Sequence, residues 1–143
     1  MAIWQFQCNI IPLREKSDNL SRDEMISWKD IPQPITNIDF LEYQKSWSTN
    51  IVQYGKIEET CIEFIYDKEE LEEIECRLDL RTLTRKKLIQ IVEYVKNISA
   101  LFFVDDKVYS PEMETMLEIM KHSKANQYCK KPIEYVASTN PNL

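Results

Sequence analysis

The sequence predicts an α+β domain with two layers, in which helices pack on one face of a mostly antiparallel sheet. Three observations support this fold class. Several segments alternate hydrophobic and polar residues, as strands with one buried face do. Short turns separate consecutive strand candidates, which favours antiparallel neighbours. Two later segments repeat apolar residues at spacings of three and four, which is typical of amphipathic helices.

The composition is that of one ordinary globular domain. The chain has 143 residues, of which 43% are hydrophobic and 29% are charged, so residues 1–143 are expected to share one core. The final segment, 138–143, reads STNPNL and is expected to fray. The N-terminus lacks the features of a secretory signal, and no apolar stretch reaches the ~20 residues of a membrane span. We therefore expect a cytoplasmic protein without a membrane partner.

The net charge and the spacing of the cysteines indicate which kinds of partner and which redox state to expect. With 18 basic and 24 acidic residues, the net charge is −6. Such a surface repels phosphate backbones, which argues against a nucleic-acid partner, and attracts a basic protein. The four cysteines are widely spaced and form no CxxC pair, so reduced thiols are expected.

The N-terminal third is expected to hold one strand and two short helices. Residues 4–10 alternate, and Pro12 ends this strand because it has no N–H for the ladder. Ser21 and Glu24 have the spacing of a capping box and open a helix, which the prolines of DIPQPITN end. Asp39 is positioned to cap a second short helix.

The middle of the chain predicts a three-stranded meander over about 50–54, 57–66 and 71–81. Turns at Gly55-Lys56 and at DKEE separate the strands. The alternation places one set of apolar residues on the inner face of this meander. That set is Ile62, Phe64, Tyr66, Ile74, Cys76, Leu78 and Leu80.

The C-terminal half predicts helices around another strand. A helix opens at Thr84 and carries Leu88, Val92 and Val95 on its apolar side. The run ALFFV is a buried strand, and DDK is a turn. Ser110 and Pro111 are expected to begin the next helix, and a last helical turn or two follows SKANQYCKKP.

The outward positions of the meander are densely charged. They include Glu59, Glu63, Glu73, Glu75, Arg77, Asp79 and Arg81. Antiparallel sheets often have one wet face, so a solvated surface is the simplest interpretation. We expect this face to be exposed and, if it has a function, to be the surface that binds a basic partner.

Motifs of common enzyme classes are missing from the sequence. One glycine cannot build a phosphate-binding loop, and no G-x-S-x-G elbow occurs. His122 lies near a helix end, where a cation complements the helix dipole. Cys129 lies beside Lys130 and Lys131, yet no base is in view. We expect no catalytic residue and no cofactor.

One enzymatic alternative rests on acidic residues. Asp67, followed by Glu75-Cys76-Arg77, is similar to the Asp…Glu-x-Lys arrangement of metal-dependent nucleases, with arginine in place of the lysine. Such spacing arises freely in charged strands, so no metal site is expected. Asp105 and Asp106 are likewise interpreted as turn residues rather than as metal ligands.

Three segments together carry a resemblance to known proteins. They are WQFQCNIIP, EIECRLDLR and the stretch from LFFVDD through SPEMETMLEIMKHSKANQYCKKPIEYV. In these segments the chain resembles a group of small, largely uncharacterised bacterial proteins that includes immunity-like proteins of polymorphic toxin systems. The resemblance implies a cytoplasmic bacterial α+β protein and assigns no functional residue.

These observations favour a non-enzymatic binding protein. Its sharpest form is a toxin-neutralising immunity protein that covers the active site of a basic toxin domain. A small metal-dependent hydrolase or nuclease that uses acids of the meander is one alternative. A structural or adaptor subunit is another, and the sequence does not separate it from the first reading.

Overall fold

The structure, a computed structural model, describes residues 2–14, 20–129 and 132–137. Its strands are β1 (Gln5–Pro12), β2 (Tyr43–Gln44), β3 (Ile51–Tyr54), β4 (Cys61–Asp67), β5 (Glu70–Asp79), β6 (Ala100–Val104) and β7 (Lys107–Tyr109). Its helices are α1 (Arg22–Ile26), α2 (Arg85–Asn97), α3 (Met113–Lys121), α4 (Lys124–Tyr128) and α5 (Ile133–Val136). The predicted tail, 138–143, lies outside the described residues.

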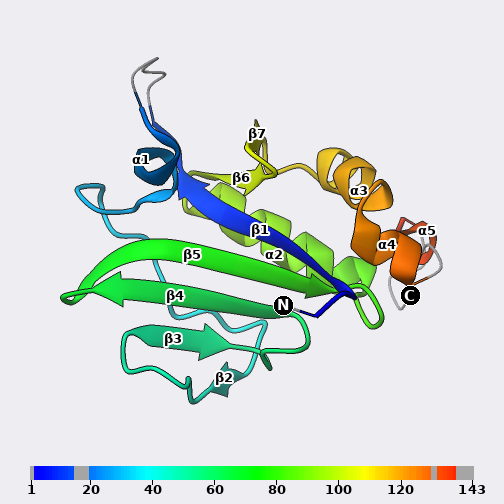
Figure 1. The fold of residues 1–143 in the computed structure, drawn as a ribbon, viewed down its shortest axis with the longest axis horizontal. Coiled ribbons are helices and arrows are strands. Elements are labelled where there is room, and N and C mark those ends of the chain that lie inside the picture. The colour runs from blue at the N-terminus through cyan, green and yellow to red at the C-terminus, as the bar shows by residue number, and fades with distance from the viewer. Residues whose placement is uncertain (1, 15–19, 130–131, 138–143) are drawn as a thin grey trace.

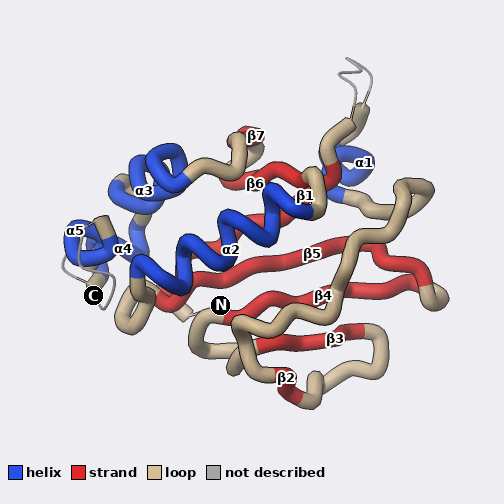
Figure 2. Tube along the Cα trace, turned by 180° about the vertical axis from the view of Figure 1, so that it is seen from behind, coloured by secondary structure: helices blue, strands red, loops and turns tan. Residues whose placement is uncertain are grey.

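The strands form one seven-stranded antiparallel sheet, in the order β2-β3-β4-β5-β1-β6-β7 (Figure 1). The helix α2 runs along one face of this sheet (Figure 2). The predicted α+β class is therefore confirmed. Within the described ranges, no helix has the length and apolar character required to cross a bilayer.

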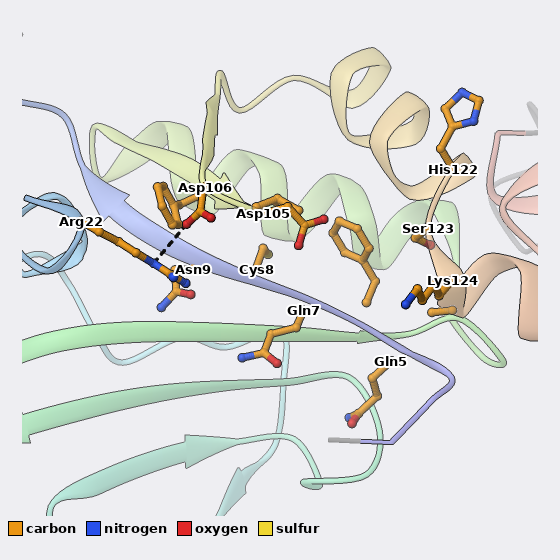
Figure 3. A pocket seen from close by; sticks show the side chains of 14 residues that line it. Gln5, Gln7, Cys8, Asn9, Arg22, Asp105, Asp106, His122, Ser123 and Lys124 are labelled. Carbon is orange, nitrogen blue, oxygen red and sulfur yellow. Dashed lines mark ion pairs between the residues drawn. The ribbon is translucent and has the colours of Figure 1, made fainter.

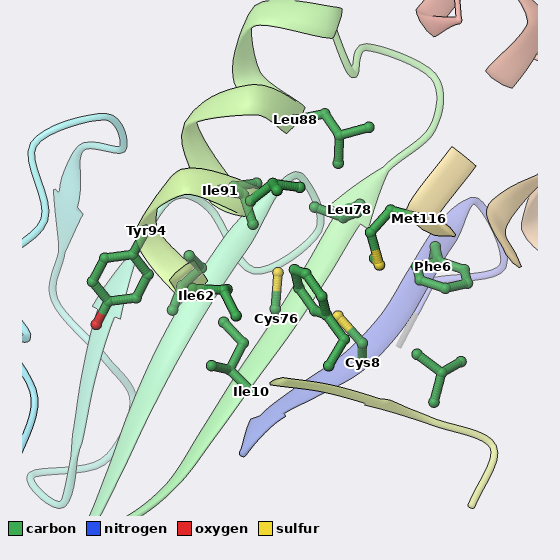
Figure 4. Close-up of a cluster of buried hydrophobic side chains, with 14 of the residues drawn as sticks. Phe6, Cys8, Ile10, Ile62, Cys76, Leu78, Leu88, Ile91, Tyr94 and Met116 are labelled. Carbon is green, nitrogen blue, oxygen red and sulfur yellow. The ribbon is translucent and has the colours of Figure 1, made fainter. Parts of the chain in front are cut away.

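The inner face of the sheet has the predicted register. Tyr66 is only half-buried, because the register of β4 shifts between Ile65 and Tyr66. The other predicted inner-face residues of the meander are at most 2% exposed, and so are Leu88, Val92 and Val95 of α2. Figure 4 shows Leu78 and Cys76 facing the side chains of α2, with Phe6 and Cys8 of β1 beside them. The helix α2 thus covers the apolar residues that the alternating pattern places on one face of the sheet. Burying these side chains stabilises the packing of the helix on the sheet.

Helix caps confirm two of the predicted starts. Ser21 and Glu24 form a reciprocal capping box at the start of α1. The Thr84 hydroxyl oxygen accepts a hydrogen bond from the backbone N–H of Lys87 at 3.1 Å and begins α2. Each cap satisfies backbone N–H groups that have no partner within the helix.

The predicted helix at Asp39 is wrong. That segment bends along α2 and leads into β2 instead. The Lys87 ammonium donates to the Phe40 carbonyl oxygen, and the Tyr94 hydroxyl donates to the Ile35 carbonyl oxygen at 2.6 Å. Side chains of α2 therefore hold this segment at two backbone carbonyls, and one of them, that of Phe40, is an acceptor that the predicted helix would use itself.

The starts of two elements differ from the prediction, and one helix was not predicted. β4 begins at Cys61, because residues 56–60 form a turn in which the Glu59 N–H donates to the Lys56 carbonyl oxygen at 2.9 Å. The N-cap of α3 is Glu112 rather than Ser110. The segment 124–128 is helical, with the Ser123 hydroxyl oxygen capping it through the N–H of Asn126 at 3.1 Å. The sequence contains one sign of this helix, because serine, here Ser123, is a residue type favoured at N-caps.

Replacing Leu78 with alanine is expected to lower the free energy of unfolding by about 2–5 kcal/mol, because its side chain is fully buried. The matched variant Leu13→Ala removes the same atoms at a position that is 62% exposed, and should change stability by no more than about 0.5 kcal/mol. Urea unfolding followed by circular dichroism compares the two. Equal losses would place Leu78 outside the core.

Candidate functional site

The outer face of the sheet brings a row of polar side chains together. The register sets Gln53 opposite Glu63, Glu63 opposite Glu75, and Glu75 opposite Asn9. The row therefore crosses β3, β4, β5 and β1. Two carboxylates directly opposite each other repel, so this arrangement requires a cation close by.

Arg77 supplies that cation from the next outward position of β5. Its guanidinium donates to Glu63 through Nη1 and to Glu75 through Nη2, the latter at 3.1 Å. The Glu63 side chain is only 4% exposed and that of Arg77 is 16% exposed. The three side chains form an ion cluster, with Glu63 buried and Arg77 and Glu75 partly covered, in which one arginine bridges two glutamates. Such a cluster favours one register of the strands, because a slip would leave a charge unpaired.

Burial also shifts the titration of groups around this cluster. It raises the pKa of Glu75, and Arg77 acts in the opposite direction. It raises the pKa of the Cys61 thiol to about 11, although Arg77 lies 3.8 Å from the sulfur and lowers it. Cys61 is therefore protonated at neutral pH and is a poor nucleophile.

A second buried acid holds the end of β5. The Asp79 carboxylate is fully buried and accepts hydrogen bonds from the Arg81 backbone N–H at 2.9 Å and from Arg81 Nε and Nη2 at 3.0 Å each. The Arg81 guanidinium in turn lies 3.9 Å from the centre of the Trp4 ring. Trp4 donates to the Glu58 carbonyl oxygen at 2.8 Å. These contacts fasten the N-terminal segment across the end of the sheet.

The expectation that this charged face is exposed is wrong for part of it. Glu63 and Asp79 are buried, at 3% and 0% exposure, and Arg77 is largely covered. Glu73 and Glu75 are half-buried, and Arg81 is exposed. The sequence pattern separates two faces but does not show how neighbouring strands cover each other's side chains. One feature of the sequence indicates this cluster: Arg77 lies two residues from Glu75, on the same face of a strand.

Glu59 lies apart from the other candidate acids. It belongs to the turn before β4, and its side chain is exposed. It lines a different cleft, of about 380 Å³, together with Thr84 and Lys87 at the end of the sheet. The turn contributes Glu58 to the outer face instead, beside Arg77. Sequence reasoning did not select Glu58, because strand periodicity does not extend into turns.

The structure does not assemble the acids of the proposed metal site. Asp67 stands opposite Glu70, whereas Glu75 stands opposite Glu63, so the two positions are separated by four residues, or about 13 Å, along β4. The Lys29 ammonium pairs with Asp67 and lowers its pKa. Across the part of the chain that the structure describes, no three His, Cys, Asp or Glu side chains converge as metal ligands.

The remaining candidates have local structural roles. His122 is the C-cap of α3, and its Nε2 lies 3.0 Å from Glu118 Oε1. Burial raises the pKa of the Cys129 thiol. Asp105 and Asp106, with φ of 48° and 65°, form the turn between β6 and β7.

Comparison with known protein families, with curated proteins and with solved structures finds no match for this chain. The function is therefore inferred from the geometry and charge of the surfaces described above.

Replacing Glu63 with glutamine is expected to lower the free energy of unfolding by about 3 kcal/mol, because it leaves the buried Arg77 guanidinium short of a charged partner. Glu58→Gln makes the same change at an exposed position and should cost less than about 0.5 kcal/mol. Guanidinium unfolding curves measure both. If the two variants were equally stable, the cluster would contribute nothing to folding.

Iodoacetamide is expected to alkylate the native protein first at Cys129, which is partly exposed, while Cys8, Cys61 and Cys76 are buried and stay protected. Peptide mass spectrometry over a time course identifies the modified thiol. The variant Cys129→Ser should remove the fast phase. Early modification of Cys61 would show that the outer face opens readily.

Proposed function

We propose that this chain is a non-enzymatic binding protein that docks a basic partner protein on the outer face of its sheet. The observation that carries the proposal is the difference between the two faces. α2 packs on one face, and no helix of the described residues lies in front of β3, β4 and β5 on the other (Figure 1). A sheet face that no described helix covers, and whose charges are held by ion pairs, is a surface on which a partner can dock in one orientation.

The charges left free on this face are acidic. Arg77 is neutralised by Glu63 and Glu75, so it orders the surface without attracting an anion. Glu58 is exposed and Glu73 is half-buried, and neither forms an ion pair among the described residues. Together with the net charge of −6, they favour the approach of a basic protein.

Apolar side chains border the same surface. Ile3 is 62% exposed and Ile57 is 44% exposed. Both line a cleft of about 530 Å³ whose wall also includes Trp4, Glu58 and Arg77. Protein interfaces commonly combine aromatic and apolar anchors with a charged rim. This end of the face therefore has the mixture of groups that a protein partner requires.

The sharpest form of the proposal is a toxin-neutralising immunity protein. The resemblance to immunity-like bacterial proteins supports it, and so does an acidic surface that suits a basic toxin domain. The mechanism is stoichiometric occlusion: the outer face covers the active site of the toxin domain, and the complex dissociates slowly because the charged face is already ordered. A structural or adaptor subunit would use the same face without neutralising an activity.

The test uses the purified product of the gene adjacent to the one that encodes this chain. We expect a one-to-one complex and loss of that protein's toxicity on co-expression. Glu58→Lys with Glu73→Lys changes the net charge from −6 to −2, since each replacement adds two charges. This double variant should slow association about tenfold at low salt, and less at high salt, because the effect is electrostatic.

The control reverses two exposed acids elsewhere, Asp39→Lys with Glu93→Lys, and reaches the same net charge of −2. Its association rate should stay close to that of the unmodified chain. Equal slowing in both variants would show that net charge alone acts and that the outer face is not the docking surface. Binding without any rescue from toxicity would replace the immunity form with an adaptor.

A further inference from the structure

A polar cleft of about 640 Å³ follows β1 beside the end of β6 (Figure 3). Its volume falls within the range of ligand sites in proteins, about 300–1,000 Å³. β1 supplies one wall, through Gln7 and its neighbours, and the turn after β6 and the start of α4 supply the other. The cleft is separate from the buried Arg77 cluster.

The cleft exists because β1 is paired unequally on its two sides. With β5 it pairs over Gln5–Ile10, but with β6 it pairs only from Asn9 to Pro12. β6 leaves β1 there because Asp105 and Asp106 turn the chain back into β7. On this side, the first half of β1 is a strand edge without a neighbouring strand among the described residues.

The direction of the backbone groups in β1 follows from two hydrogen bonds. The Leu80 N–H donates to the Trp4 carbonyl oxygen at 3.1 Å, so Trp4 faces β5. The Leu13 N–H donates to the Ser99 carbonyl oxygen at 3.2 Å, so Leu13 faces the side of β6. Residues alternate in an antiparallel strand, so even positions of β1 bond toward β5 and odd positions toward β6.

Gln7 is therefore an odd position whose backbone groups point into the cleft. No described residue takes its N–H or its carbonyl oxygen in a hydrogen bond. The neighbouring odd position, Gln5, has its N–H bonded to the Ala2 carbonyl oxygen at 3.0 Å. The Gln7 N–H and carbonyl are the pair with which a further strand would exchange hydrogen bonds.

The charged groups of the cleft indicate the chemistry of its occupant. Figure 3 shows Asp105 and Lys124 directed into the cleft, whereas His122 points away. Asp106 is paired with Arg22 at 3.2 Å, and Asp105 has no ion-pair partner among the described residues. An occupant therefore gains most from a cation opposite Asp105 and from an acceptor near Lys124.

We propose that this cleft binds an extended peptide segment of a partner protein, which pairs with β1 at Gln7 and places a basic side chain against Asp105. The inference rests on the proposed binding function but does not involve the outer-face acids. Backbone hydrogen bonds would provide the affinity for the segment, and Asp105 would select a segment with a basic residue. In strand addition, main-chain hydrogen bonds commonly give affinity and side-chain contacts give specificity. The lysine ammonium of α4 would bind a carbonyl or carboxylate oxygen of the same segment.

The test uses a capped hexapeptide with the sequence Thr-Val-Lys-Val-Lys-Thr, titrated into the full chain and followed by amide NMR. In the free protein, the Gln7 amide should exchange with solvent faster than that of Asn9, which β6 pairs. The peptide should produce saturable shifts at Gln5–Asn9 and slow the exchange of Gln7. Shifts confined to other strands, or no saturable binding, overturn the proposal.

Matched controls separate backbone pairing from charge. Two analogues of the peptide, N-methylated either on both valines or on both lysines, block opposite edges of the extended chain. One should bind worse than the other, and equal binding by both analogues and the parent would rule out strand pairing. Asp105→Asn keeps a residue tolerant of positive φ and should weaken binding roughly threefold. The exposed control Asp39→Asn should not change it.

The outer-face variant distinguishes the two proposals. Glu58→Lys alone lies outside the cleft and keeps the hydrogen bond from the cleft residue Asn9 to Glu73. This outer-face variant should bind the hexapeptide as tightly as Asp39→Lys, which has the same net charge. If the peptide fails to bind while that variant still slows association with the partner protein, the cleft proposal fails alone. If the peptide binds at Gln7 but the outer-face variant has no effect, docking on the sheet face fails instead.

Discussion

The pairing of β1 on both of its sides is the constraint on which the rest of the structure depends. β1 comes first in the chain, yet it lies between β5 and β6 and joins the meander to the C-terminal hairpin. Asn9 is paired with Glu75 on one side and with Phe103 on the other. Contacts between residues so distant in sequence carry a loop-closure cost, which the burial of apolar side chains such as Phe6 and Ile10 offsets.

β1 also connects the two proposed binding surfaces. Its outward side chains belong to the polar face, where Asn9 donates to Glu73 at 2.9 Å. Its backbone edge lines the cleft, because β6 turns away after Val104. A partner that covered the outer face and also placed an extended segment beside Gln7 would contact one continuous surface. Gln5 lines both clefts and marks where they meet.

The two faces of the sheet follow from the same alternation of residues but are stabilised in different ways. On the inner face, hydrophobic side chains lose contact with water against α2, and shape decides the packing. On the outer face, packing within the sheet covers Glu63 and Asp79 as well, and these charges need partners. Arg77 and Arg81 supply these partners. Several charged residues of this face therefore stabilise the fold instead of facing the solvent. The acids that remain free, Glu58 and Glu73, are those a partner can use.

The amino-acid sequence by itself determined the fold class, the inner face of the meander and the caps at Ser21 and Thr84. These features depend on local periodicity and on hydrogen bonds between near neighbours, which sequence spacing records directly. Only the tertiary structure decided the place of β1 in the sheet, the burial of Glu63, the loss of the helix at Asp39 and the open edge at Gln7. Each of these depends on which distant segment lies alongside, because burial and backbone pairing are set by neighbours in space rather than in sequence.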